Sequence, residues 1–167
     1  RKKGEIDKAI SIHESLLDQE KVDLSSFDRE MIELELAQDF MSAGMLERAL
    51  DPLSGLLKSE HANEALAMTL HIYEQTREWQ KGIDAYLNTK ASAISDKNRQ
   101  LISHFYCEIA EAPDPAKNKE SVYKRALKVH SDCIRSLVSL AKLYLVLNQK
   151  QKSRELIVKI LDKDPNF

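Results

Sequence analysis

Histidine and carboxylate side chains stand at helical spacing along the chain, and this is the first pattern that could do chemistry. His71 and Glu74 are three residues apart, and His104 and Glu108 are four residues apart. On a helix, either spacing places both side chains on one face, where they could hold a metal ion. The HExxH pattern that combines these residue types in metalloproteases is absent. We therefore interpret both pairs as hydrogen-bonding groups of a surface or groove and predict no metal site.

The other common chemical motifs are missing as well. Cys107 and Cys133 lie 26 residues apart and form neither a CxxC nor a CxxH pair, which argues against a metal ribbon or a thioredoxin-like centre. We expect both cysteines to be small buried apolar residues, as suits a reducing compartment such as the cytoplasm. The chain also lacks GxSxG, P-loop and GxGxxG sequences. It is predicted to be no enzyme and to need no cofactor.

Composition sets the fold class and narrows the range of partners. The 167 residues include four glycines and four prolines, and a chain so poor in both and rich in Leu, Ala, Glu and Lys is typical of an all-α domain. The net charge of −2 lacks the basic excess of a nucleic-acid-binding protein. No apolar run approaches the ~18 residues that span a bilayer, and no signal peptide opens the chain. A soluble fragment with protein partners is expected.

An internal repeat with a period near 34 residues positions these side chains. A small residue followed by an apolar helical stripe recurs at Ala9, Ala49, Gly82 and Ser153, and the off-pattern Lys119 fills the gap. The successive spacings are 40, 33, 37 and 34 residues. This period is typical of the tetratricopeptide repeat, a pair of antiparallel helices of about 34 residues. The sequence therefore predicts an all-α tetratricopeptide-repeat superhelical solenoid.

The repeats divide the chain into one array. We predict a partial first repeat over 1–20, and complete repeats at about 28–59, 62–92, 97–130 and 133–164. The chain enters in the middle of a repeat, and a further unit is expected to follow it. Gly44 is predicted to end the first helix of its pair, and Ala49 to lie where the two helices cross closely. Trp79 is interpreted as an inter-helix packing residue rather than a ligand platform.

The first helix of each pair lines the inner, concave side of such an array. Its residues here run from apolar through acidic to basic and could form a groove for a peptide or a helix. The candidate protein-binding residues are Met31, Leu34, Gln38, Met41, Glu64, Ala67, His71, Glu74, Leu101, His104, Glu108, Arg135, Val138 and Lys142. Flexible methionines are common on adaptable binding surfaces. A second interpretation stays open, in which the preceding helix of residues 5–18 covers Met31, Leu34 and Met41. The Lys and Asn pair of a carboxylate clamp is absent.

Four stretches carry a more specific signal than the repeat itself. They are KGEIDKAISIHESLL (3–17), AQDFMSAGMLERA (37–49), EWQKGIDA (78–85) and HFYCEIA (104–110). The last is the most specific, because the repeat pattern does not dictate its Phe-Tyr-Cys core. Together they resemble the lipopolysaccharide assembly protein B family. The resemblance is good over 3–110, is lost over 113–132, and over 133–167 holds mainly as a repeat.

The resemblance implies a location and a role. That family has an N-terminal transmembrane helix, a cytoplasmic repeat array and a C-terminal rubredoxin-like metal ribbon with two CxxC pairs, and this sequence matches the middle part. The resemblance implies a cytoplasmic adaptor at the inner membrane of a bacterium with an outer membrane. It would present the LpxC deacetylase to the FtsH protease and so balance lipopolysaccharide against phospholipid. No metal site is carried over, because both CxxC pairs are missing here.

Other functions and states remain open. The chain could be a different repeat adaptor, such as a co-chaperone or secretion-system scaffold, that shares only the repeat. It could also support an enzyme or metal site elsewhere in a longer chain. Homo-oligomerisation is possible.

Overall fold

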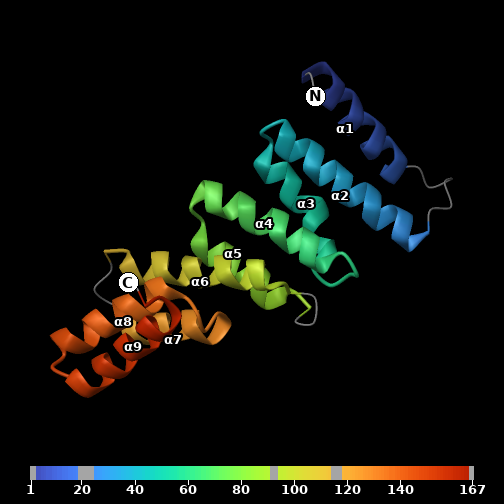
Figure 1. Cartoon of the computed structure of the whole chain (residues 1–167). Helices are drawn as coiled ribbons and strands as arrows, with labels where there is room; N and C mark the ends of the chain where they lie inside the picture. The colour runs from blue at the N-terminus through green and yellow to red at the C-terminus, as the bar shows by residue number, and fades with distance from the viewer. Residues whose placement is uncertain (1–2, 19–24, 91–93, 114–117, 166–167) are drawn as a thin grey trace. The chain divides into compact units, whose positions relative to one another are not determined.

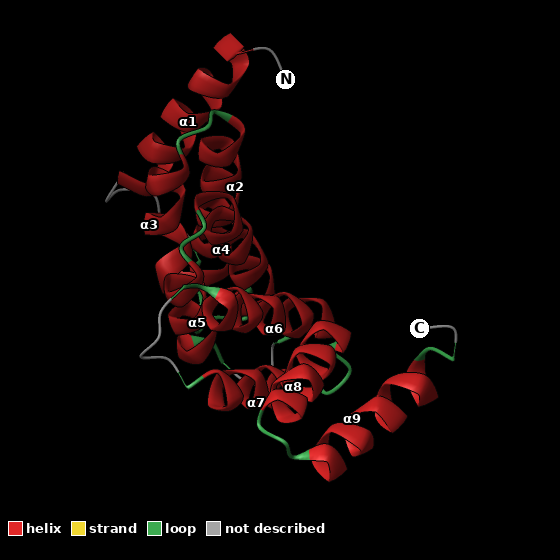
Figure 2. Cartoon of the chain, turned by 90° about the vertical axis from the view of Figure 1, so that its left-hand side faces the viewer, coloured by secondary structure: helices red, strands yellow, loops and turns green. Residues whose placement is uncertain are grey.

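The computed structural model describes residues 3–18, 25–90, 94–113 and 118–165, and every regular element in these ranges is a helix (Figure 1). In order, the helices are α1 (Lys3–Asp18), α2 (Ser26–Ser42), α3 (Leu46–Leu56), α4 (Ala62–Thr76), α5 (Trp79–Asn88), α6 (Asp96–Glu111), α7 (Lys119–Val129), α8 (Ile134–Val146) and α9 (Lys150–Lys163). Figure 2 shows them joined by loops, with no strand in this part of the chain. The predicted all-α class is confirmed. The predicted repeat ends at 19–20 and 91–92 lie outside the described residues.

The helices group into two compact units. Unit 1 comprises residues 1–76 and 85–94, and unit 2 comprises residues 77–84 and 95–167. The division falls within α5, whose first part belongs to unit 2 and whose second part belongs to unit 1.

In unit 1, α2 packs against both α1 and α3, and α3 packs against α4. The core between them is built from apolar side chains at spacings of three and four residues, because this spacing gathers them on one face of each helix. Its fully or nearly fully buried members include Ala37, Phe40, Leu53, Leu56 and Leu66. Leu53 and Leu57 are 0% and 7% exposed.

The turn between α2 and α3 explains why a glycine is favoured at residue 44. Gly44 has a φ of +76°, in the left-handed region that side chains disfavour. Its N–H donates to Met41 O at 3.0 Å, and the N–H of Met45 donates to Phe40 O at 2.8 Å. These two hydrogen bonds form a Schellman motif, which satisfies the last carbonyls of α2. The prediction that Gly44 ends this helix agrees with the geometry.

The same turn recurs at the repeat spacing. Arg77, 33 residues after Gly44, has a φ of +58°, and Asn148, 104 residues after it, has a φ of +56°. The N–H of Asn148 donates to Leu145 O at 3.0 Å, and that of Gln149 donates to Tyr144 O at 2.8 Å. Three helices therefore end in the same left-handed conformation at one repeat position.

Unit 2 is built on contacts of α6 with α7 and α8, of α7 with α8, and of α8 with α9. Its core includes Ile102, Phe105, Leu137, Leu140 and Ile160. The ring centroid of Trp79 lies 5.2 Å from that of Phe105, which supports a packing role for the tryptophan. Helix α6 ends at Glu111, and α7 begins at Lys119.

Small residues occupy the close helix crossings. Ala49 is 0% exposed and Ser153 is 1% exposed. The hydroxyl of Ser153 also donates to the carbonyl of Ala141 at 3.0 Å, which ties α9 to α8. Lys119, the off-pattern residue, is exposed at the start of α7, so its side chain does not enter a crossing.

The apolar face of α9 differs from that of α3. Ile157 and Leu161, the repeat counterparts of Leu53 and Leu57, are 42% and 43% exposed.

In the described residues, no helix is both long and apolar enough to cross a bilayer.

Candidate protein-binding site

Three of the predicted inner-face residues line one concave surface of unit 1. Gln38 and Met41 project from α2 and His71 projects from α4. The hollow has a volume of about 360 Å³. We call it the α2–α4 hollow, and its full lining is Gln38, Met41, Ser42, Leu46, Met68, His71 and Gln75.

Helix geometry explains why these residues meet. Gln38 and Met41 are three residues apart on α2, and Met68, His71 and Gln75 follow at spacings of three and four on α4. Each set therefore forms one stripe along its helix. α3 contacts both α2 and α4 and holds the two stripes beside each other.

The lining combines soft apolar side chains with polar ones. Met41, Leu46 and Met68 are half-buried, whereas Gln38, His71 and Gln75 are exposed. His71 is held on both sides: its Nε2 lies 2.9 Å from Gln75 Nε2, and its Nδ1 lies 3.9 Å from Glu74 Oε2. An apolar floor with hydrogen-bonding groups at its edge suits a protein segment better than an ion.

The charge around the α2–α4 hollow is negative. Glu64 and Glu74 are both exposed on α4. More broadly, residues 1–94 contain 11 basic and 18 acidic residues, for a net charge of −7. A partner segment that carries basic residues next to an apolar residue would match this surface.

The remaining predicted residues of unit 1 lie outside the hollow. Met31 is 37% exposed, and Glu64, Ala67 and Glu74 are exposed. Leu34 differs from the other predicted residues of unit 1, because it is 7% exposed and belongs to the core. Its burial agrees with the second interpretation, and its helix α2 packs against both α1 and α3. For Met31 and Met41 that interpretation does not hold, since neither side chain is buried.

In unit 2 the structure ties two of the predicted residues to each other. Arg135 of α8 donates through Nη1 to Glu108 Oε1 at 2.6 Å, and through Nη2 to Glu111 Oε2 at 2.5 Å. The hydrogen bonds with Glu111 and Glu108 raise the pKa of Arg135, so the side chain stays charged. This network joins α6 to α8. Leu101 and Val138 are half-buried, whereas His104 and Lys142 are exposed.

Sequence reasoning missed Ser42, Leu46, Met68 and Gln75. A usable signal existed for two of them, because Met68 and Gln75 lie three and four residues from the predicted His71. Ser42 and Leu46 flank the α2–α3 turn. Their approach to α4 depends on how that turn is folded, which helical spacing does not describe.

The two cysteines are buried, as predicted, but they are not in purely apolar surroundings. Cys107 Sγ lies 3.0 Å from Ser136 Oγ. A hydrogen bond with Cys133 and burial raise the pKa of Cys107, whereas hydrogen bonds with Cys107, Ser103 and Ser136 lower that of Cys133. No cluster of three or more His, Cys, Asp or Glu residues that could hold a metal ion occurs in the described ranges.

Comparison with known proteins identifies relatives of this chain, although no family model matches it. Lipopolysaccharide assembly protein B of Haemophilus influenzae is 31% identical over 175 residues, covering 100% of this chain and 42% of the relative. The protein of the same name from Escherichia coli K12 is 30% identical over 168 residues, covering 98% of this chain and 42% of the relative. The chain spans less than half the length of these curated relatives.

A solved structure supports the fold independently. The crystal structure of MamA protein, a tetratricopeptide-repeat protein, superposes with a TM-score of 0.54 at 18% identity, covering 98% of this chain and 85% of that chain. Together with the helix pairs described above, this likeness confirms the predicted tetratricopeptide-repeat fold. The two curated relatives confirm the predicted family resemblance.

Proposed function

We propose that this homologue of lipopolysaccharide assembly protein B is a protein-binding scaffold that holds a partner segment in the α2–α4 hollow. In the cell it would present the LpxC deacetylase to the FtsH protease and so regulate lipopolysaccharide synthesis. The main support for the binding site is that Met41 and Met68 line one hollow together with exposed polar side chains. The hollow lies on helix pairs of a repeat fold that serves protein interaction. The role in lipopolysaccharide synthesis draws on the names of the relatives and on the family resemblance.

The size of the hollow suggests how a partner would bind. Its volume of about 360 Å³ is near the lower end of the ~300–1,000 Å³ range of small-molecule pockets, and it is open at the surface of two helices. It would admit an anchoring apolar side chain of a partner rather than enclose a metabolite. Methionine side chains adapt their shape readily, so Met41 and Met68 could pack around different anchors.

The polar edge would set the orientation of the bound segment. Gln38 and Gln75 can each donate and accept hydrogen bonds with a peptide backbone. The acidic side chains of α4 would favour a basic residue next to the anchor, and this attraction would weaken as salt is added. The proposal assigns no catalytic residue and no cofactor to this chain.

The location is part of the same proposal. The curated relatives are more than twice as long as this chain, so contacts with the protease and the membrane would involve other parts of the protein. We place the repeat array at the cytoplasmic face of the inner membrane, where it could reach both the protease and the deacetylase.

Co-purification of full-length variants tests the proposal. Met41→Asp and Met68→Asp each place a charge in the hollow, and we expect either change to reduce recovery of LpxC or FtsH from mild-detergent extracts about tenfold or more. Met31→Asp is the matched control, because it makes the same change on α2 outside the hollow. The control should recover the partners as the unaltered protein does.

Two results would count against the proposal in different ways. Recovery of neither LpxC nor FtsH with the unaltered protein would contradict the regulatory role, and recovery of a chaperone or secretion component instead would favour the more general adaptor. Equal losses for Met31→Asp and Met41→Asp would contradict the assignment of the hollow as the binding site.

A further inference from the structure

The charge of this chain is unevenly divided along its length. Residues 95–167 contain 14 basic and nine acidic residues, a net charge of +5, in contrast to −7 for residues 1–94. The excess is concentrated from residue 118 to residue 163, where 11 basic and four acidic residues occur. This range covers α7, α8 and α9 of unit 2.

Ion pairs within unit 2 leave much of this positive charge unbalanced. Glu120 Oε1 pairs with Lys124 Nζ at 2.7 Å, and it also accepts a hydrogen bond from the Tyr144 hydroxyl at 2.9 Å. Asp132 pairs with Lys163. Two of the four acidic side chains are thus already engaged with lysines of the same unit.

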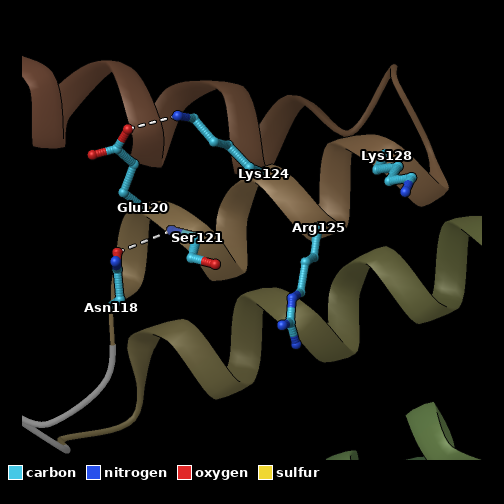
Figure 3. A pocket seen from close by; sticks show the side chains of 6 residues that line it. All are labelled: Asn118, Glu120, Ser121, Lys124, Arg125 and Lys128. Carbon is cyan, nitrogen blue, oxygen red and sulfur yellow. Dashed lines mark hydrogen bonds and ion pairs between the residues drawn. The ribbon is translucent and has the colours of Figure 1, made fainter.

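Arg125 and Lys128 of α7 are the cations best placed to meet a partner. Both are exposed, and within the described residues neither makes an ion pair or a side-chain hydrogen bond. Figure 3 shows Glu120 and Lys124 directed toward each other on one side of α7, with Arg125 pointing away from them.

These two cations belong to a polar stripe that runs the length of α7. Asn118, Ser121, Arg125 and Lys128 follow one another at spacings of three, four and three residues, so they lie along one face. Together with Glu120 and Lys124 they line a surface hollow of about 440 Å³ (Figure 3). Ten residues of helix extend about 15 Å, which matches three turns of a neighbouring helix or a short extended segment.

We propose that this stripe, which we call the α7 basic stripe, docks an acidic segment of a protein partner. Carboxylates spaced along the segment would pair with Arg125 and Lys128, and Ser121 and Asn118 would contribute hydrogen bonds at the other end. The inference rests on the proposed function only in taking the partner to be a protein. It assigns a second surface, in unit 2, that is separate from the α2–α4 hollow in unit 1.

The surroundings of the stripe favour a protein over other polyanions. A single-stranded nucleic acid would need aromatic side chains for base stacking, but Tyr123, the aromatic residue of α7, is buried. A membrane-binding helix carries large apolar side chains opposite its basic face, and none of the exposed large apolar residues in the described ranges belongs to α7.

Fluorescence anisotropy with a defined acidic peptide tests the inference on the 167-residue chain. The probe is a fluorescein-labelled 14-residue peptide with glutamates at i, i+3, i+4 and i+7, and its control is the same peptide with glutamine at those positions. We expect the glutamate peptide to bind at low salt, and Arg125→Glu with Lys128→Glu to weaken binding about tenfold or more, because two attractions become repulsions. Binding should also weaken steadily as salt rises and the Debye length shortens.

A matched double variant separates a specific surface from net charge. Lys8→Glu with Lys58→Glu changes the charge by the same amount at exposed lysines of unit 1, and it should alter peptide affinity less than twofold. Met41→Asp should leave the affinity for the glutamate peptide unchanged. A wrong assignment of the α2–α4 hollow can therefore be told apart from a wrong assignment of the α7 basic stripe. Circular dichroism of the two double variants should match that of the unaltered chain, since the four replaced side chains are exposed.

Three results would overturn the inference. One is the absence of glutamate-peptide binding at low salt, or equal binding of the glutamine peptide. Another is an equal loss of affinity for the two double variants. The third is capture of the chain by vesicles containing phosphatidylglycerol, lost in the Arg125→Glu and Lys128→Glu variant and not competed by the peptide, which would assign the stripe to a membrane surface.

Discussion

At the scale of the residue, the small side chains at helix crossings set how closely the helices of a pair approach. Ala49 is fully buried in the α2–α3 pair, and Ser153 is nearly so in the α8–α9 pair. Ser153 adds a hydrogen bond across its crossing to Ala141 O. A larger side chain at either position would need space that the close-packed helices do not contain.

Replacing Ala49 with tryptophan should therefore destabilise unit 1. We expect Ala49→Trp to lower the free energy of unfolding by roughly 1–3 kcal/mol or more, because the indole overpacks the crossing. Thermal and urea unfolding followed by circular dichroism measure this change. Ala67→Trp, at an exposed alanine of α4, is the control and should stay within about 0.5 kcal/mol of the unaltered chain. Similar losses for both would mean that the repeat register is misplaced.

Leu34 and Met41 give a second test at this scale, because the sequence alone placed both on the inner face. The structure buries Leu34 and leaves Met41 half-buried at the hollow. We expect Leu34→Asp to cost about 3 kcal/mol or more, since it buries a charge without a partner, whereas Met41→Asp should cost less than half as much. Urea unfolding of the two variants measures the difference. A Leu34→Asp variant as stable as the unaltered chain would mean that Leu34 lies on the open surface and not in the core.

At the scale of the element, equivalent helices of the repeat differ in what covers them. Leu53 of α3 and Leu57, the residue that caps its C-terminus, are buried, and α3 packs against α4. Their counterparts on α9, Ile157 and Leu161, are 42% and 43% exposed. The sequence pattern is the same in both helices, so burial here reflects the neighbouring helix and not the residue type.

Paired substitutions can measure this difference between the two helices. Ile157→Glu with Leu161→Glu should reduce the free energy of unfolding of this chain by about 1–2 kcal/mol at most, because these side chains keep contact with water in the folded state. Leu53→Glu with Leu57→Glu should cost far more and abolish cooperative folding of unit 1, since both carboxylates would be buried without partners. Unfolding curves that coincide for the two double variants would contradict the assigned helix packing.

At the scale of the whole molecule, the described residues contain no cluster of three or more side chains that could hold a metal ion. Of the histidines that first suggested a metal site, His71 lies beside Glu74, whereas Glu108, the carboxylate four residues from His104, pairs with Arg135. The two cysteines share buried hydrogen bonds with serines in unit 2. What distinguishes the two units is their charge, which is acidic over residues 1–94 and basic over 95–167.

Metal analysis of the purified chain addresses this scale. We expect inductively coupled plasma mass spectrometry to find zinc and iron well below one equivalent per chain, because a structural site normally needs four ligands in tetrahedral geometry. His71→Ala and His104→Ala should leave the trace content of zinc and iron unchanged. A stoichiometric metal lost in either variant would overturn our interpretation of the histidines.

The fold was largely predictable from the sequence, whereas the binding site was only partly so. The repeat period and the helix-forming composition led to the correct class, and Gly44 marked a helix end because its position requires a positive φ. Helical spacing also found Gln38, Met41 and His71, which share the hollow. It could not separate Leu34 from them, since residues on one helix stripe look alike until a neighbouring helix covers some of them.

By itself, the sequence determined the all-α repeat architecture, the family resemblance and the division of charge, because periodicity, specific stretches and net charge are properties of the chain alone. The tertiary structure decided which side chains come together: it placed Met41 and Met68 in one hollow, tied Arg135 to Glu108 and Glu111, and left Arg125 and Lys128 without partners among the described residues. The reason is physical. Local spacing places a side chain on a face of its own helix, but burial and pairing depend on contacts between helices that are distant in sequence.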